Sequence, residues 1–306
     1  MIKYIVLITL ILFISLNIYL DQYYKNKFKK ENFPPNIIYP LKEDIELPDV
    51  EEGKEIPKNI YRCYKDLEGI NKFVKVFNLT EERMPEYKQI YYTDVLIDKY
   101  IKENYNQRIY NAYKSINPDY GAARADFFRY LIIYKEGGLY MDIKSGPRKE
   151  IRDFLKNYQN KLLVSIGKTG NLWRFIPREH LKYFFNFDDD WGYITGLWPN
   201  SEYQQFIIAS NKGNPILGKV IQQVVTNIEE GIKNKNLYLS GKYSVLAMTG
   251  PIMYSLVINK YKDKYKDKIS FFKEDFDRNF KHSLIDYKKI MKENHYSKIK
   301  NKQIII

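Results

Sequence analysis

A carboxylate and a guanidinium stand three residues apart in a segment that is otherwise strongly apolar. Residues 120–146 read YGAARADFFRYLIIYKEGGLYMDIKSG, and a helix there places Asp126 and Arg129 on one face. An isolated pair of this kind is most simply a surface salt bridge. The surrounding aromatic and aliphatic residues instead predict a helix that is buried on much of its circumference. Charges in such a helix must be paired or used in chemistry, because an unpaired buried charge is costly.

The sequence also predicts how a further carboxylate, Asp142, joins this pair. A helix capped by Asp119 is stopped by the glycine pair at 137–138. The apolar residues 139–143 then predict a buried strand whose end carries Asp142 and Lys144. The carboxyl end of this strand should therefore complete one compact polar site with the helix.

Short elements upstream predict an α/β fold around this site. Residues 56–64, 74–77 and 89–92 read as strands, and residues 94–104 read as a helix. Alternating strands and helices favour a mostly parallel sheet flanked by helices. Ligands of such sheets bind at the carboxyl ends of the strands, where we expect Asp142.

The chain divides into an anchor, a stem, a folded domain and a tail. Residues 4–20 carry no charge and would span about 26 Å as a helix, and no small-residue cleavage site follows them. They predict an uncleaved single-pass membrane anchor rather than a signal peptide. The segments are the anchor at 1–21, a proline- and acid-rich stem at 22–55, the domain at 56–287 and a basic tail at 288–306.

The sequence leaves the side of the membrane open. Four lysines between residues 25 and 30, against Lys3 before the span, favour a cytosolic domain under the positive-inside rule. The glycosylation sequon that begins at Asn78 is compatible with a lumenal domain instead.

Composition excludes several classes of protein. The net charge of +13 would suit a polyanion, yet much of the excess lies at 25–30 and 288–302, and no nucleic-acid-binding motif is present. We therefore expect no nucleic-acid partner. The single Cys63 excludes an intrachain disulfide and a cysteine-rich zinc site. The absence of G-x-S-x-G and H-E-x-x-H motifs argues against a hydrolase.

The polar segment resembles sugar-transferase family 32, whose DxD-containing enzymes include yeast-type initiating mannosyltransferases and capsular-polysaccharide-type transferases. Residues 56–58 resemble the family's I-P-K opening strand, with Tyr64 where tryptophan is usual, and residues 249–251 resemble the later T-G-P landmark. The resemblance covers about residues 56–257. The family pattern is roughly A-R-x-S-D-x-x-R-Y, then Y-x-x-G-G-x-Y and an acidic strand end, and it appears here as Ala123, Arg124, Asp126, Arg129, Tyr130, Tyr134, Gly137, Gly138, Tyr140 and Asp142.

This resemblance implies a GT-A fold and a retaining transfer of a hexose. The donor would be a UDP- or GDP-hexose, and the acceptor a glycan, glycoprotein or glycolipid. The implied catalytic residues are Asp126, Arg129 and Asp142, and Tyr64 would stack on the nucleobase. The implied donor-binding residues are Tyr64, Arg124, Gly138, Asp142 and Lys144.

A departing nucleoside diphosphate requires positive charge, and the sequence leaves its source open. Asp142 offers a carboxylate to Mn²⁺ or Mg²⁺, the cofactor that the resemblance implies. The second acidic position of the DxD is Lys144, whose ammonium could neutralise the diphosphate instead. The acidic run at 188–190 could supply a second carboxylate, although it also reads as a solvated loop.

The sequence is compatible with two rival hypotheses, and it contains one further candidate histidine. The chain could be a non-catalytic sugar or nucleotide-sugar binder on the same fold, or a basic scaffold at a membrane surface. His282 falls roughly where related transferases place a histidine near the diphosphate, while His180 and His295 lack metal-binding spacing. Aromatic residues suited equally to core packing or to an acceptor groove are Trp173, Tyr183, Phe184, Phe185, Trp191 and Trp198.

Overall fold

The computed structural model describes most of the predicted domain. The described residues are six positions between 12 and 22, and then 39–152, 155–156, 158–168, 201–233, 240–272, 278–286, 299 and 302–306. The acidic run at 188–190, the aromatic group between 173 and 198, His180 and His295 lie outside them, as does most of the predicted anchor. No helix among the described residues is long and apolar enough to cross a membrane.

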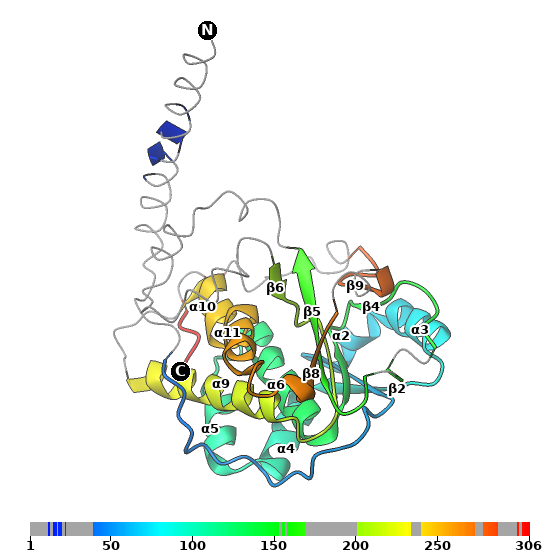
Figure 1. Ribbon diagram of the computed structural model, residues 1–306, viewed down its shortest axis with the longest axis horizontal. Helices are drawn as coiled ribbons and strands as arrows, with labels where there is room; N and C mark the ends of the chain where they lie inside the picture. Colours follow the sequence, from blue (N-terminus) through cyan, green and yellow to red (C-terminus); the bar gives the residue numbers. More distant parts are fainter. Residues whose placement is uncertain are drawn as a thin grey trace.

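A seven-stranded sheet forms the centre of the fold, in the order β2-β1-β3-β7-β5-β6 with β8 paired to β5 (Figure 1). β1 is parallel to β2 and β3, β7 is antiparallel to β3 and β5, β6 is antiparallel to β5, and β8 is parallel to β5. Five strands therefore run one way and two the other, which confirms the predicted mostly parallel α/β sheet. The strands are β1 (Asn59–Tyr64), β2 (Lys88–Thr93), β3 (Gly138–Met141), β5 (Leu162–Lys168), β6 (Ser201–Tyr203), β7 (Ile207–Ser210) and β8 (Ile269–Phe272).

Helices cover the sheet, and two further short strands, β4 (Gly146–Pro147) and β9 (Phe280–Lys281), pair beside it. The predicted helix at 94–104 is confirmed, and it begins where the Thr93 hydroxyl accepts the Leu96 N–H. The helices are α2 (Leu67–Asn71), α3 (Val74–Arg83), α4 (Asp94–Asn104), α5 (Gln107–Ser115), α6 (Gly121–Glu136), α9 (Pro215–Lys233), α10 (Gly241–Met248) and α11 (Pro251–Tyr261).

Two local predictions are wrong. Residues 74–77, predicted as a strand, form the first turn of α3, whose buried Val76, Phe77 and Thr80 follow a helical spacing. Asp119 does not cap α6, which begins after Tyr120 without a side-chain cap. A turn precedes the helix, and the Asp119 carboxylate pairs there with Lys302.

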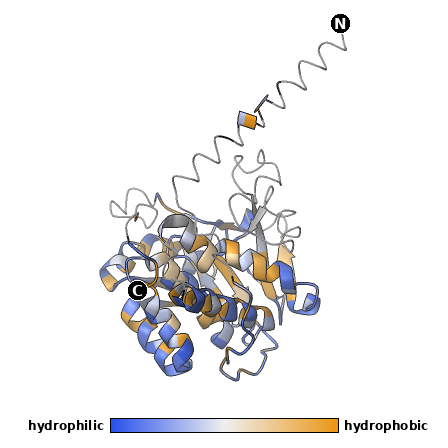
Figure 2. Cartoon of the chain, turned by 90° about the vertical axis from the view of Figure 1, so that its left-hand side faces the viewer, coloured by the Kyte–Doolittle hydropathy of each residue, from blue (hydrophilic) through white to orange (hydrophobic). Residues whose placement is uncertain are grey.

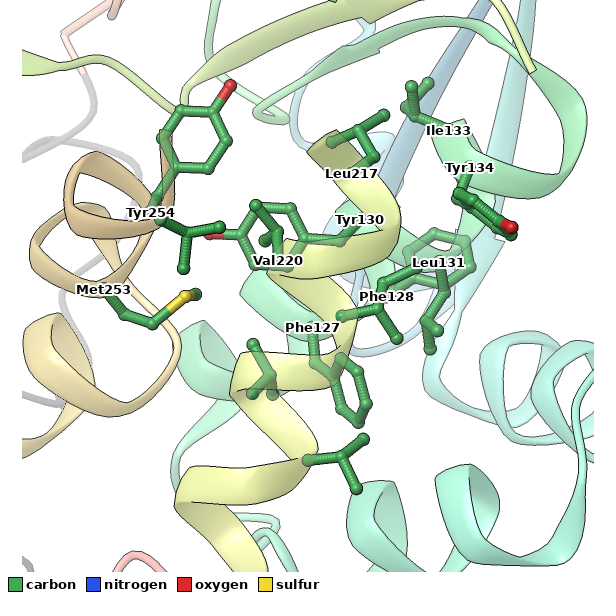
Figure 3. Close-up of a cluster of buried hydrophobic side chains, with 14 of the residues drawn as sticks. Phe127, Phe128, Tyr130, Leu131, Ile133, Tyr134, Leu217, Val220, Met253 and Tyr254 are labelled. Atoms are coloured by element: carbon green, nitrogen blue, oxygen red, sulfur yellow. The ribbon is translucent and has the colours of Figure 1, made fainter. Parts of the chain in front are cut away.

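The core lies on both faces of the sheet, and the larger part packs around α6. As predicted, α6 is buried on most of its circumference, and Figure 3 shows part of the core cluster to which Phe127 and Leu131 of α6 belong together with Leu217 and Val220 of α9. Figure 2 shows that hydrophobic residues concentrate inside the domain, while outward turns are mainly hydrophilic. The pair of charges on α6 is thus surrounded by apolar packing.

Residues 39–55, which the sequence assigns to the stem, pack on the domain without forming a helix or strand. Ile45 is 1% exposed and belongs to the main core. The Gln222 side chain of α9 donates to the Ile45 carbonyl at 2.9 Å, and the Tyr39 N–H donates to Asn227 at 3.3 Å. The packed part of the chain therefore begins before the predicted boundary at residue 56.

Part of the predicted basic tail is also packed. The carbonyl of Ile304 accepts the Asn117 N–H at 2.8 Å, and the Ile306 N–H donates to Ser115 at 2.9 Å. Ile304 is fully buried, whereas Ile306 is 72% exposed. Residues 303–306 thus close over the turn that leads into α6.

This packing gives a matched pair of variants. Ile304→Ala should lower the free energy of unfolding by about 2–4 kcal/mol, because it leaves a cavity in a filled core. Ile306→Ala should change it by less than about 0.5 kcal/mol, since this side chain is exposed. Urea unfolding of both variants is the measurement, and equal effects would contradict the docking of residues 303–306.

Candidate active site

Asp142 follows β3 directly, at the carboxyl end of the parallel strands. Its N–H donates to the Phe206 carbonyl at 2.8 Å, and its own carbonyl accepts the Ser145 N–H at 2.8 Å. The turn after β3 is therefore fixed by backbone hydrogen bonds. The side chain of Asp142 is 23% exposed, so it reaches the edge of the sheet where α/β proteins bind ligands.

The three predicted catalytic residues meet in one cluster. Nη2 of Arg129 lies 2.9 Å from Oδ1 of Asp126 and 3.2 Å from Oδ1 of Asp142. The Asp126 and Arg129 side chains are only 10% and 7% exposed. The geometry confirms that they come together, and it distinguishes the buried pair from the outward Asp142.

The other nitrogens of Arg129 also point at protein acceptors. Nη1 donates to the Gln205 carbonyl at 2.7 Å, and Nε donates to the Ala125 carbonyl at 3.4 Å. The guanidinium lies 4.7 Å from the centre of the Tyr140 ring. Arg129 is thus held from several sides by protein groups and orients the carboxylate of Asp142.

Asp126 is a buried carboxylate with an elevated pKa. Its Oδ2 accepts a hydrogen bond from the Thr249 hydroxyl at 3.1 Å. Burial raises the pKa of Asp126 from 3.8 to about 6, opposed by the positive charge of Arg129 and by Thr249 and reinforced by Asp142. Asp126 therefore changes charge within the range of ordinary assay buffers.

This pKa predicts a pH-dependent stability difference. An acid whose pKa is higher in the folded state than in the unfolded state binds more protons when folded. Its contribution to stability therefore falls as the pH rises from the unfolded pKa through the folded pKa. Relative to the wild type, Asp126→Asn should become more stable by roughly 2–3 kcal/mol between pH 4 and pH 7.5. Urea unfolding of both proteins across this range measures the change. A constant difference would contradict the raised pKa.

Lys144 and His282 complete the outward side of the site. The Lys144 carbonyl accepts the Leu284 N–H at 2.9 Å, and the Ser145 hydroxyl donates to the His282 carbonyl at 2.7 Å. Nε2 of His282 lies 3.8 Å from Oδ2 of Asp142. Burial and the nearby charge of Arg129 lower the pKa of the half-buried Lys144, and Asp142 opposes that shift. Two basic side chains therefore stand beside one outward carboxylate.

Arg62 is a supporting residue that the sequence analysis missed. It is fully buried in β1, and its Nη1 donates to the carbonyls of Asp142 and Ser145, each at 2.8 Å. Nη2 donates to the Thr80 hydroxyl at 3.0 Å. Burial lowers the pKa of Arg62 to about 10, so it stays positively charged at neutral pH. A charged residue in the middle of an apolar strand was the available signal.

Gln205 and Thr249 also support the site, and the sequence showed neither in that role. They come from the segments before β7 and before α11, far from α6 along the chain. Thr249 belongs to the T-G-P landmark, but nothing in the sequence connects it with Asp126.

Two predicted donor residues make other contacts within the chain. The ring of Tyr64, at the carboxyl end of β1, lies over Gly69, where an added Cβ would come within 2.0 Å of it, and 5.6 Å from the Phe73 ring. Nε of Arg124 donates to the Ile116 carbonyl at 3.0 Å. Tyr64 keeps a position at the ligand edge of the sheet, whereas Arg124 holds the turn before α6.

Gly138, a third residue predicted to bind the donor, has a backbone role. It is the first residue of β3, and its φ of +94° favours glycine. An added Cβ would lie 2.8 Å from the Asn59 carbonyl oxygen. Asp142 follows the other end of the same strand, roughly 13 Å away at the usual rise per residue. Close strand packing accounts for a glycine at this position, and the donor contact of Gly138 stays a prediction.

The described residues around Asp142 do not by themselves fit a divalent-cation site. Mg²⁺ and similar cations need several oxygen ligands at about 2.0–2.6 Å. Asp126 is already bound to Arg129 and Thr249, and Lys144 occupies the second position of the DxD. Across the described ranges, no group of three His, Cys, Asp or Glu side chains could hold a metal ion. Among the described residues, the implied Mn²⁺ or Mg²⁺ site therefore has Asp142 but no second carboxylate, and the acidic run at 188–190 lies outside them.

Comparison with known proteins matches this part of the chain. Residues 70–162, which include Asp126, Arg129 and Asp142, match the family described as "Glycosyltransferase sugar-binding region containing DXD motif". The initiation-specific alpha-1,6-mannosyltransferase of Candida albicans is 26% identical over 249 residues, covering 75% of this chain and 61% of that protein. Its Schizosaccharomyces pombe counterpart is 25% identical over 244 residues, covering 76% and 55%. The chain thus spans less than two thirds of either relative.

Further similarities are more limited. A mannosyl phosphorylinositol ceramide synthase of Saccharomyces cerevisiae is 32% identical over 101 residues, covering 33% of this chain and 26% of that protein. Among solved structures, PaToxG Glycosyltransferase aligns with a TM-score of 0.39 and 17% identity, covering 69% of this chain and 71% of that one. A TM-score this low adds nothing to the description of the fold.

Proposed function

We propose that this chain, whose resemblance to sugar-transferase family 32 is confirmed by the match over residues 70–162, transfers a hexose from a nucleotide-sugar donor to a glycoconjugate acceptor. One observation carries the proposal. Asp142 is partly exposed at the carboxyl end of β3, and a buried arginine that is itself fixed by Asp126 orients its carboxylate. This preorganised carboxylate lies inside the matched region.

The site residues have separate roles in this proposal. The outward oxygen of Asp142 accepts hydrogen bonds from donor hydroxyls, while Arg129 and Asp126 fix its orientation from inside. The Tyr64 ring, at the same edge of the sheet, offers an aromatic face to the nucleobase. Retention of the anomeric configuration is proposed from the family resemblance.

The donor sugar and the acceptor are proposed from the relatives. The names of two relatives specify an alpha-1,6-mannosyltransferase, and the name of a third specifies a mannosyl phosphorylinositol ceramide synthase. Mannose is therefore the first hexose to test, and mannosylated glycans and inositol-containing sphingolipids are the first acceptors.

Membrane attachment through residues 4–20 is part of the same proposal. It is supported by the uncharged stretch alone. Alkaline carbonate extraction should leave the full chain in the pellet and release a chain that lacks residues 1–21. Release of both would contradict the anchor. Protease protection of sealed vesicles would then determine the side of the membrane.

The function is tested by nucleotide release from the full chain in detergent. We expect release of nucleotide from one sugar in a panel of UDP- and GDP-hexoses, with a higher rate when a mannosylated acceptor is added. A product whose new bond has the donor's configuration would support retention. Binding of a donor without turnover would favour a non-catalytic sugar-nucleotide binder, and silence across the panel would overturn the proposal.

A further inference from the structure

We propose that Lys144 takes the place of the divalent cation, so that this chain binds the donor diphosphate through an ammonium group without metal. The inference rests on the proposed function and specifies how its donor site works. Asp142 follows β3, and two positions later the chain has the cationic Lys144 where the DxD pattern has a second carboxylate.

The backbone holds Lys144 in a defined place. Nη1 of Arg62 donates to the backbone carbonyls of Asp142 and Ser145, which lie before and after Lys144 in the chain. On the opposite side of the turn, the Lys144 carbonyl accepts the Leu284 N–H, and the Ser145 hydroxyl bonds to the His282 carbonyl. Four hydrogen bonds thus fix the turn from β1 and from the segment after β9.

The charges around Lys144 favour a polyanion over a metal ion. Arg129 is balanced inside the cluster by Asp126 and Asp142, at 2.9 and 3.2 Å. A divalent ion at Asp142 would meet the nearby ammonium of Lys144, and among the described residues Asp142 is the one outward carboxylate of the cluster that could bind it. A diphosphate meets the same ammonium with opposite charge, and a lysine can bind phosphate oxygens as a point charge.

The same ammonium suits the departing group. When the bond between the sugar and the diphosphate breaks, its electron pair stays on the leaving phosphate oxygen, which gains negative charge. A fixed cation at that oxygen stabilises the transition state more than the ground state. Lys144 would supply this positive charge, so that no bound metal ion is needed there.

The test measures binding of GDP and of UDP to the full chain by calorimetry, in EDTA and in Mn²⁺. For the nucleotide that binds, we expect wild-type affinities in the two conditions to agree within about threefold. Lys144→Ala should weaken binding in EDTA roughly 10- to 100-fold, the usual range for a lost charge-assisted hydrogen bond. Lys144→Arg should keep most of the affinity. Lys149→Ala removes a lysine five residues away that is exposed, and it should bind like the wild type.

The most informative variant is Lys144→Asp. It supplies a second carboxylate at the D-x-D spacing, so we expect binding to be lost in EDTA and restored at least about 10-fold by Mn²⁺. Thermal unfolding without nucleotide shows that each variant is folded.

The failures can be told apart. Wild-type binding that disappears in EDTA and returns with Mn²⁺ would overturn the role of Lys144 and leave the proposed function standing. Unchanged affinity of folded Lys144→Ala would do the same. No binding of either nucleotide in any condition, together with no nucleotide release from the hexose panel, would overturn both proposals.

Discussion

Asp142→Asn should lower the rate of sugar transfer by about 100- to 1,000-fold while leaving the fold intact. The substitution keeps the size of the side chain but removes the negative charge that Arg129 orients at 3.2 Å. Loss of one preorganised electrostatic group in an active site costs about this much. The backbone N–H and carbonyl of Asp142, which hold the turn after β3, are unaffected.

The measurement is kcat with the best donor of the panel, together with thermal unfolding. Asp98→Asn is the matched control, because Asp98 pairs with Lys114 at 2.8 Å on the outer surface and should leave transfer unchanged. A Tm of Asp142→Asn within a few degrees of the wild type would separate a lost function from a lost fold. Transfer within about threefold of the wild-type rate would remove Asp142 from the proposed site.

The central cluster could be predicted because its members are close in the sequence. Asp126 and Arg129 are three residues apart on one helix, and the strand that carries Asp142 follows that helix after a glycine turn. Helical periodicity and the glycine stop therefore contain enough information to bring the three together. Local reasoning also predicted β1, β2 and α4, from short runs of β-favouring residues for the strands and from the helical segment between them and the next motif.

The supporting residues come from distant parts of the chain, where no local pattern reports their contacts. The Gln205 carbonyl reaches Arg129 across 76 residues, and Thr249 reaches Asp126 across 123. Such pairs depend on tertiary packing, which sequence periodicity does not encode. The prediction of a strand at residues 74–77 was wrong for another reason, because so short an apolar run fits a strand or a helix equally well.

Arg129→Met should give the largest loss of stability, about 3–5 kcal/mol near pH 8. It removes the buried cation between Asp126 and Asp142, and it leaves the carbonyl of Gln205 without its donor from Arg129. Removing one partner of a buried ion pair costs this much because the other charge stays buried and uncompensated. Arg108→Met is the control, since Arg108 is 34% exposed and its pairs should contribute no more than about 1 kcal/mol.

The pH dependence identifies Asp126 as the cause. Arg129 holds the pKa of Asp126 down against burial, so its removal should raise that pKa above the wild-type value of about 6. The penalty exists only while the carboxylate is ionised, so the loss should shrink as the pH falls through the raised pKa. The double variant Asp126→Asn with Arg129→Met has no such charge and should regain roughly 2 kcal/mol at pH 8 with little pH dependence. Urea unfolding from pH 5 to pH 8 measures all three proteins. If Arg129→Met were as unstable as the double variant at every pH, the loss of stability would come from lost packing and not from the uncompensated carboxylate.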